Sequence, residues 1–561
     1  MKARKLLVVP LLVGALTLSA CQGMKTDQPP ADQGDQSSVP AIAINPKDRA
    51  ELTEGGELRL TVTTIESQWN TYQVNGNTGD MSDVWNPIAP KFFTFDEKGT
   101  PTWNPDYLTE EPVVTTGPTK VTMKINKSAK WGNGTAIGVK DFQSIWKACN
   151  GEDTTFECAS TDGWNEIASI EAGADEQEVI TTFKSNFPDW SSVLSSVPAA
   201  DSTKDASTFN SGSTGPKSEY EAGPFTVESF DKTQRKITYV PNPNWWGEKP
   251  LLDRITIREM EATARANAFT NNELDAFDVG VDADAYTRSK GYADGEVRQA
   301  AGPDWRHITF NSKAGELKDI KVRQAIVYGL NRTEIGASDL AGIDWPVKPL
   351  NNHFFMEAQP GFVDTAKATG IDYDIEKAKS TLEEAGWKAP EGDPEGVRVK
   401  DGKELKVKFM QLSGVPVSEN EALQVQNQLK KVGIGIDIVS IPSEKFSDTL
   451  TERGFELMAF SWLGTPYPMA NINQIYGTGS ESNFANLSLP EVDNLAKEIG
   501  TEPDNQVRID KTNQVDKLLW ENVHTLPLYQ RPQNTAVKKN LANYGSFGMA
   551  SVDWTKVGYL K

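Results

Sequence analysis

The sequence predicts an α/β protein, and two kinds of pattern point to this fold class. Apolar residues alternate with polar ones at 405–409 and 434–438, as in strands with one buried face, and a helical stripe lies between them. Such a strand–helix–strand unit is the building block of domains whose parallel sheets are covered by helices. Similar alternation at 58–62, 121–125 and 255–257 predicts further strands.

The helix of this unit has a predicted start and a predicted end. Ser418 and Glu421 have the spacing of a capping box, so we expect the helix to begin at Ser418, and Gly433 is placed to end it. The apolar stripe between these signals consists of Ala422, Val425, Leu429 and Val432. Because its spacing is that of one helix face, we assign it to the core.

Three more helices are expected at 322–330, 378–386 and 490–499, where apolar residues recur at steps of three or four. Stretches rich in Gly, Pro and Ser at 198–224 and 388–402 predict loops. Together these elements predict helices that cover sheets in more than one part of the chain.

The net charge excludes one class of function. Of 561 residues, 57 are Lys or Arg and 78 are Asp or Glu, which gives a charge of −21. Nucleic-acid binders gain affinity by placing a basic face on phosphates, and so acidic a chain repels a polyanion. We therefore expect no nucleic-acid partner.

The first residues indicate export. Residues 1–20 contain three basic residues and then an apolar run from Leu6 to Leu18, as in a cleaved signal peptide. The sequence Leu-Ser-Ala-Cys at 18–21 resembles a bacterial lipobox, so we expect a lipid on Cys21; the alternative is a plain signal peptide with a chance cysteine. Residues 21–54 are polar and are expected to form a flexible tether. The expected location is the extracytoplasmic face of a bacterial cell membrane.

The two remaining cysteines are expected to pair. Cys149 and Cys158 form an even pair nine positions apart, and an exported protein meets an oxidising environment. A disulfide that closes so short a segment contributes about 2–3 kcal/mol to stability. Two unpaired buried thiols remain the alternative.

Signatures of catalysis and metal binding are missing from the sequence. It contains no Gly-x-Ser-x-Gly and no Walker A motif. The three histidines, His307, His353 and His524, lie far apart and lack zinc-ligand spacing. We therefore expect a binding protein with no catalytic residue, no metal site and no cofactor, and we expect each histidine to make ordinary hydrogen bonds.

Five segments carry one resemblance, and they follow one another at 121–146, 223–260, 310–311, 322–332 and 378–387. They include a Lys-Trp before a Gly turn, a Gly-Pro-Phe followed by Asn-Pro and paired tryptophans, Phe-Asn, Val-Arg-x-Ala, and Ala-Lys-x-x-Leu-x-x-Ala-Gly-Trp. The set resembles the family 5 extracellular solute-binding proteins, which are the oligopeptide and dipeptide receptors of ABC importers.

This resemblance implies a two-lobed periplasmic-binding-protein type II (Venus flytrap) fold with an inserted subdomain. The first lobe is expected at 55–84, 221–283 and 525–561, the inserted subdomain at 85–220, and the second lobe at 284–524. Two crossing strands are expected to form the hinge between the lobes.

The resemblance also implies a function. A monomeric, lipid-anchored receptor is expected to capture oligopeptides between its lobes and to deliver them unaltered to an ABC permease. Contacts made by both lobes exist only when the cleft is closed, so ligand binding favours closure. The alternatives are another cargo (a siderophore, haem, a glycan or a metal complex), a secreted hydrolase, or a surface sensor.

One predicted group of ligand-binding residues follows a tryptophan in the second lobe: Trp462, Gly464, Thr465 and Tyr467. In peptide receptors of this family, an Asp three residues after the tryptophan holds the peptide ammonium, and here Thr465 takes that place. A hydroxyl supplies no negative charge. A blocked, cyclic or longer peptide, or a non-peptide, is therefore left open.

A second predicted group follows the first strand and consists of Trp69, Asn70 and Tyr72. This segment usually lines the cleft in the family, so we expect these side chains to face the ligand. The alternative is that they fix the loop while its backbone meets the ligand.

Overall fold

The computed structural model describes residues 39–561, and it is mixed α/β. The predicted signal peptide, the lipidation site Cys21 and the tether residues up to 38 lie outside the described residues. The names first lobe, inserted subdomain and second lobe are kept below for the residue ranges given above.

A four-stranded sheet forms the core of the first lobe, in the order β1-β10-β9-β8. β1 and β10 are strands with one buried face, as the alternation of their apolar residues predicted, and they bury Leu58, Ile255 and Ile257. The two strands pair in parallel. The elements of this lobe before the crossing strands are β1 (Glu57–Val62), α1 (Gly79–Trp85), β8 (Phe225–Asp231), β9 (Lys236–Pro241), β10 (Arg254–Glu259), α5 (Ala262–Thr270) and β11 (Ala276–Asp278).

The inserted subdomain has its own sheet, in the order β4-β5-β7-β6, and its own apolar core. Cys149 at the end of α2 and Cys158 form a disulfide with a Cα–Cα distance of 5.8 Å, as predicted. The elements are β2 (Phe93–Phe95), β3 (Pro101–Trp103), β4 (Val113–Thr115), β5 (Lys120–Lys124), α2 (Val139–Cys149), β6 (Ile167–Ala172), β7 (Glu178–Phe183), α3 (Trp190–Leu194) and α4 (Ala206–Ser211). The last of these lies in the expected loop at 198–224.

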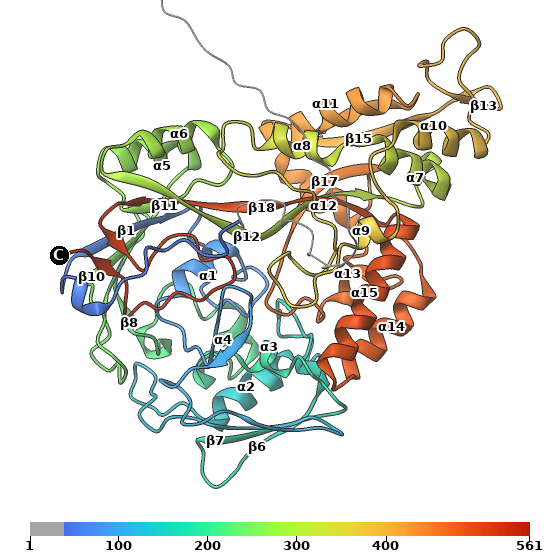
Figure 1. Cartoon of the computed structure of the whole chain (residues 1–561). Helices are drawn as coiled ribbons and strands as arrows, with labels where there is room; N and C mark the ends of the chain where they lie inside the picture. Colours follow the sequence, from blue (N-terminus) through green and yellow to red (C-terminus); the bar gives the residue numbers. More distant parts are fainter. Residues whose placement is uncertain (1–38) are drawn as a thin grey trace, which may run out of the picture. The chain divides into compact units, whose positions relative to one another are not determined.

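A six-stranded sheet with the order β11-β18-β12-β17-β15-β16 joins the two lobes. Its long strands, β12 (Gly295–Phe310) and β18 (Thr525–Lys538), run antiparallel across the middle of Figure 1. At one end β18 pairs with β11 of the first lobe, and at the other β12 pairs with β17 (Leu457–Leu463) of the second lobe. The expected lobe boundaries therefore cut through one continuous sheet.

The predicted strand–helix–strand unit is present as β15 (Lys406–Leu412), α11 (Pro416–Lys430) and β16 (Gly435–Ile441), with parallel strands. The predicted capping box of Ser418 and Glu421 was wrong. The helix begins at Pro416, and Glu421 is fully buried in a two-pronged ion pair with Arg306 of β12, with N–O distances of 2.7 and 2.6 Å. The Glu421 carboxylate, which would have capped the helix, instead accepts charge-assisted hydrogen bonds from Arg306 of the sheet.

The other predicted helices of the second lobe are also present, with their apolar stripes in the core. The helices and short strands not yet placed are α6 (Ala283–Gly291), α7 (Ile320–Gly329), α8 (Arg332–Asp339), α9 (Thr365–Ala368), α10 (Ile375–Glu384), β13 (Val399–Lys400), β14 (Lys403–Glu404), α12 (Phe446–Thr451), α13 (Ile472–Tyr476), α14 (Pro490–Thr501), α15 (Asn505–Asn522), β19 (Leu541–Ala542) and β20 (Gly558–Tyr559).

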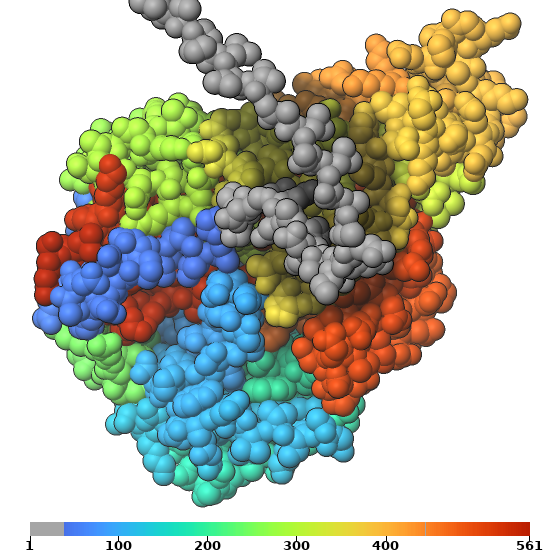
Figure 2. Space-filling model, viewed as in Figure 1, coloured from blue at the N-terminus to red at the C-terminus, as the bar shows by residue number. Residues whose placement is uncertain are grey.

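Residues 39–54 correct the expected length of the tether. Ala43 pairs with Ser546 and Leu52 with Leu560, and Leu52 is buried. In addition, the buried Arg298 donates to the carbonyl of Ile44 at 3.1 Å. Figure 2 shows this blue N-terminal stretch lying along the red C-terminal residues. The polar composition of these residues suggested a tether. Composition does not reveal this pairing, because mostly backbone groups make it.

Candidate functional site

The segment after β1 is held tightly by the inserted subdomain. The backbone N–H of Trp69 donates to Ser213 at 2.7 Å, and the Asn70 side chain donates to the carbonyl of Phe209 at 3.0 Å. The Asn70 side-chain oxygen also accepts from the Tyr72 N–H at 3.1 Å. Asn70 is buried and its polar atoms are used within the protein, which matches the alternative that it fixes the loop.

The disulfide loop also supports the same segment. Ala159 donates its N–H to the Tyr72 carbonyl at 2.9 Å, and Val74 donates to Glu157 at 3.0 Å. The backbone of Gln73 also forms an isolated antiparallel β-bridge with that of Cys158. The predicted disulfide is therefore adjacent to a predicted binding segment, a relationship that the sequence did not indicate.

The second predicted group lies where β17 ends. Trp462 lies opposite Trp305 of β12, and its ring stacks on Phe484 with centroids 5.8 Å apart and an angle of 8° between the planes. Leu463, the next residue, is 68% exposed. The indole is thus fixed by its neighbours at the edge of a loop that presents an apolar side chain to solvent.

Gly464 is needed where the loop passes close to another backbone. Its N–H donates to the Pro303 carbonyl at 2.9 Å, and a Cβ at this position would lie 2.5 Å from that oxygen. Thr465 uses its hydroxyl within the loop, because Oγ1 accepts from the Tyr467 N–H at 3.2 Å. The position at which an ammonium-binding Asp was expected therefore holds a neutral, loop-stabilising side chain.

Residues 464–468, which follow Trp462 and are called the tryptophan loop below, contact the inserted subdomain. The ring of Tyr467 packs edge-on against Phe95 of β2, with centroids 5.9 Å apart. Burial raises the pKa of Tyr467 to about 12, so its phenol is uncharged at physiological pH. Gly99, on the turn after β2, also approaches Pro466 closely.

An ion pair adds a polar contact at this interface. Arg508 of α15 and Asp189, the residue before α3, form a salt bridge in which their side chains are 4% and 11% exposed. Arg508 also donates to the carbonyl of Ile499 at 3.0 Å. Figure 2 shows the inserted subdomain and the orange-red helices of the second lobe adjoining on one face.

Two pockets lie along this interface, and Asp189 lines both. One, of about 240 Å³, is lined by residues 98–101 and 188–191 of the inserted subdomain and by residues 355–360, 466–469 and 505–509 of the second lobe. The other, of about 620 Å³, is lined by residues near the disulfide and by α13 and α14. Cavities between two bodies are common places for ligands to bind.

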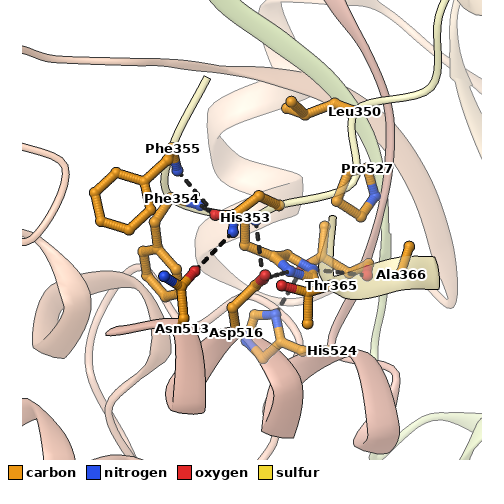
Figure 3. A network of polar contacts seen from close by, with 12 residues as sticks. Leu350, His353, Phe354, Phe355, Thr365, Ala366, Asn513, Asp516, His524 and Pro527 are labelled. Atoms are coloured by element: carbon orange, nitrogen blue, oxygen red, sulfur yellow. Dashed lines mark hydrogen bonds and ion pairs between the residues drawn. The ribbon is translucent and has the colours of Figure 1, made fainter. Parts of the chain in front are cut away.

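The histidines support the second lobe from within. His353 directs one ring nitrogen to Asp516 at 2.6 Å and the other to the Thr525 carbonyl at 3.1 Å (Figure 3). His524 donates from Nε2 to the Asn483 side-chain oxygen at 3.2 Å and accepts from the Thr525 hydroxyl at 2.6 Å. All three histidines are buried, and no cluster of potential metal ligands occurs within residues 39–561.

The structure does not bring the two predicted groups together. Trp69, Asn70 and Tyr72 line a pocket whose lining residues all fall within 69–220, whereas Tyr467 lines the pocket that contains Arg508. Sequence reasoning missed Phe95, Asp189 and Arg508. No local signal marks them, because each contributes only after residues far apart in the chain meet.

These features define a class of protein: a binding protein with two lobes that two crossing strands connect, and with cavities between the second lobe and the inserted subdomain. The family model described as "Bacterial extracellular solute-binding proteins, family 5 Middle" matches residues 102–484. The chain belongs to this family, and its fold is the type II periplasmic-binding-protein fold. In the part of the chain from residue 39 onward, no helix is long and apolar enough to cross a membrane.

The similarity to known proteins extends over almost the whole chain. The oligopeptide-binding protein OppA of Mycobacterium tuberculosis is 32% identical over 567 residues, which cover 99% of this chain and 93% of that protein. The solved structure of the periplasmic EDTA-binding protein EppA has a TM-score of 0.83 at 24% identity, with 94% of this chain and 100% of that one covered. Oligopeptide-binding AppA from Bacillus subtilis, in complex with a nonapeptide, has a TM-score of 0.70 at 21% identity and covers 91% and 100%.

Proposed function

We propose that this protein is a lipid-anchored receptor on the extracytoplasmic face of the cell membrane that delivers oligopeptides to an ABC importer. The observation that carries the proposal is the 32% identity to an oligopeptide-binding protein across 99% of the chain. The lipobox at Cys21 supports the anchor. The receptor acts as a monomer, and its cargo leaves chemically unchanged.

Binding works through closure of the cleft. The second lobe contacts the inserted subdomain through Tyr467 and Phe95 and through Arg508 and Asp189. Cargo that contacts both bodies binds the closed form more tightly, so it shifts the population toward that form by the difference in affinity. The permease then recognises the closed form.

The tryptophan loop supports a preference for cargo without a free ammonium. Trp462 and Leu463 offer apolar surface, Gly464 lets the loop approach the crossing strand, and Thr465 adds no charge. Burial of an ammonium without an opposite charge costs several kcal/mol. We therefore assign the cargo as peptides whose N-terminus is blocked, is cyclised or lies outside the cleft.

A metal chelate is the second candidate cargo. The structural likeness to the EDTA-binding protein favours it, with a TM-score of 0.83, and NikZ from Campylobacter jejuni in complex with Ni(L-His) has a TM-score of 0.74. Residues 39–561 contain no cluster of metal-ligating side chains. A metal would therefore arrive already held by its own small-molecule ligand.

Mass spectrometry of the ligand released from purified protein tests the proposal. Peptides of unchanged mass are the expected result, and calorimetry with matched free and N-acetylated peptides should show tighter binding of the acetylated form. Recovery of only a metal chelate would replace the peptide assignment by the second candidate. Cleaved peptides would instead indicate a hydrolase.

A further inference from the structure

A cavity of about 440 Å³ lies between the first lobe and the inserted subdomain. Its lining residues fall within three ranges: 86–107 of the inserted subdomain, and 224–248 and 551–556 of the first lobe. None of them belongs to the second lobe, and none lines either of the two pockets at the interface with that lobe. The cavity is therefore separate from those pockets.

Five charged side chains line this cavity, and three of them are paired within the protein. Asp553 and Lys556 form a salt bridge at 2.8 Å, and Glu248 forms one with Arg49 at 3.6 Å. The other two are a lysine and an aspartate that have no ion-pair partner among residues 39–561. One positive and one negative charge of the cavity walls are thus left without compensation.

The unpaired cation is Lys91. Its ammonium donates to the Asn86 side-chain oxygen at 2.5 Å, and that oxygen also accepts from the Trp554 indole N–H at 2.8 Å. Both neighbours line the cavity, as does Asp553, whose charge acts on Lys91, so the ammonium lies at the cavity wall. Burial lowers the pKa of Lys91 to about 8, which leaves it mostly charged at neutral pH. An ammonium has three N–H donors, and this hydrogen bond uses one of them.

The unpaired anion is Asp106. Its backbone carbonyl accepts from the Asn126 side chain at 2.9 Å and from the Trp246 indole at 2.6 Å, which fixes the residue in place. Its carboxylate accepts no hydrogen bond from residues 39–561. Burial, together with the charges of Asp553 and Glu248, raises the pKa of Asp106. Because these two carboxylates also line the cavity, a cation beside Asp106 is attracted by all three.

A ligand with a single charge fits these walls poorly. An anion at Lys91 would leave Asp106 unpaired and would meet three wall carboxylates, and a cation at Asp106 would leave Lys91 unpaired. Charged groups away from water are stabilised by an opposite charge and by hydrogen bonds. A molecule with both charges supplies both partners. Phe95, Tyr107 and Trp245 also line the cavity, and rings of this kind pack well against the carbon chain between two charges.

We propose that this cavity is a second binding site, which takes a small zwitterion with its carboxylate on the Lys91 ammonium and its ammonium on the Asp106 carboxylate. Amino acids, including those with the amino group at the far end of the chain, belong to this class. The site goes beyond the receptor function, because its walls come from one side of the cleft and its occupancy requires no closure.

Five small molecules test this site on the intact protein. Glycine, 4-aminobutyrate and 6-aminohexanoate are zwitterions of increasing length, whereas butyrate carries only the anion and butylammonium only the cation. Saturation-transfer difference NMR measures the affinity of each. Lys91→Met and Asp106→Asn each remove one charge at nearly constant side-chain size, and Lys232→Met, on the exposed turn between β8 and β9, is the matched control.

The expected result is saturable binding of at least one zwitterion, at least about tenfold tighter than that of either singly charged molecule. Lys91→Met and Asp106→Asn should each weaken it by about tenfold, whereas Lys232→Met and the cleft variant Arg508→Ala should not. A singly charged molecule that binds as tightly as the zwitterions, no saturable binding, or an affinity that neither cavity variant lowers would overturn the proposal. If Lys91→Met does not fold, as judged by circular dichroism, Asp106→Asn decides. Peptide binding, measured separately, tests the receptor function, so either assignment can fail alone.

Discussion

Arg508 and Asp189, which are 319 positions apart in the chain, form a buried ion pair that joins the second lobe to the inserted subdomain. The pair lies beside the pocket lined by Tyr467, so the contact that closes the interface and the predicted binding loop are neighbours. A buried charge without a partner is energetically costly. The charge of Arg508 is therefore compensated by the inserted subdomain, and the charge of Asp189 by the second lobe.

Arg508→Ala should favour the open protein. Removal of one partner of a buried pair typically costs about 3–5 kcal/mol, and opening of the lobes relieves that cost by returning Asp189 to water. Small-angle scattering should show a larger radius of gyration, and cargo should dissociate at least about tenfold faster. Lys511→Ala is the control, because Lys511 lies on the same helix but pairs with Glu498 and Glu502 of its own lobe. Unchanged scattering and dissociation would remove the role assigned to the pair.

Gly464→Ala should displace the tryptophan loop. The added Cβ would lie 2.5 Å from the Pro303 carbonyl oxygen and 3.0 Å from the Met356 methyl carbon, and the oxygen belongs to the backbone. Calorimetry should show a loss of cargo affinity of about tenfold or more, while circular dichroism stays native. Gly291→Ala, at the end of α6, where no atom approaches within 4 Å, should bind normally. Equal binding by both variants would place the cargo elsewhere.

Thr465→Asp should change which N-termini are accepted. An Asp keeps an acceptor for the Tyr467 N–H and adds the charge that balances a peptide ammonium. The ratio of affinities for free and N-acetylated peptides should therefore rise about tenfold or more, as measured by calorimetry with matched pairs. Thr465→Asn is the neutral control. A ratio that does not respond to Asp would show that the N-terminus lies away from this loop.

Cys149→Ser should affect both stability and binding. Loss of a disulfide that closes a short segment lowers the free energy of unfolding by about 2–3 kcal/mol, which a thermal melt detects. The loop that it closes also holds the backbone at Tyr72 and Val74, so cargo affinity should fall as well. If the melt shifts and the affinity does not, the segment after β1 takes no part in binding.

His524 should make the protein less stable in acid. Burial lowers the pKa of His524 to about 3, so the folded state binds fewer protons than the unfolded state between that pH and the ordinary histidine range. Its contribution is complete above about pH 6.5 and is lost as the pH falls, at up to about 1.4 kcal/mol per pH unit. Denaturant unfolding of His524→Gln across this range should show a smaller loss than the wild type. Parallel curves would contradict the assignment of a neutral ring.

Local patterns predicted the unit β15–α11–β16 because alternation and helical spacing act over a few residues. The start of α11 was misplaced because the burial of Glu421 against Arg306 depends on a residue more than a hundred positions away. Asp189 and Arg508 could not be predicted for the same reason: each is one of many charged residues in the sequence, and only the assembled interface distinguishes them. The tryptophan loop was located through the resemblance, whereas the structure supplied its contact with Phe95.

The stretch from residue 39 to 54 enters the body beside the crossing strands, where the Ala301 N–H donates to the Pro40 carbonyl at 2.8 Å. The stretch is thus held by the paired chain ends and by Arg298, which donates to the carbonyls of Ile44, Leu541 and Tyr544. A tether of the kind proposed would therefore pull on the two paired chain ends together, and on the crossing strand β12 beside them.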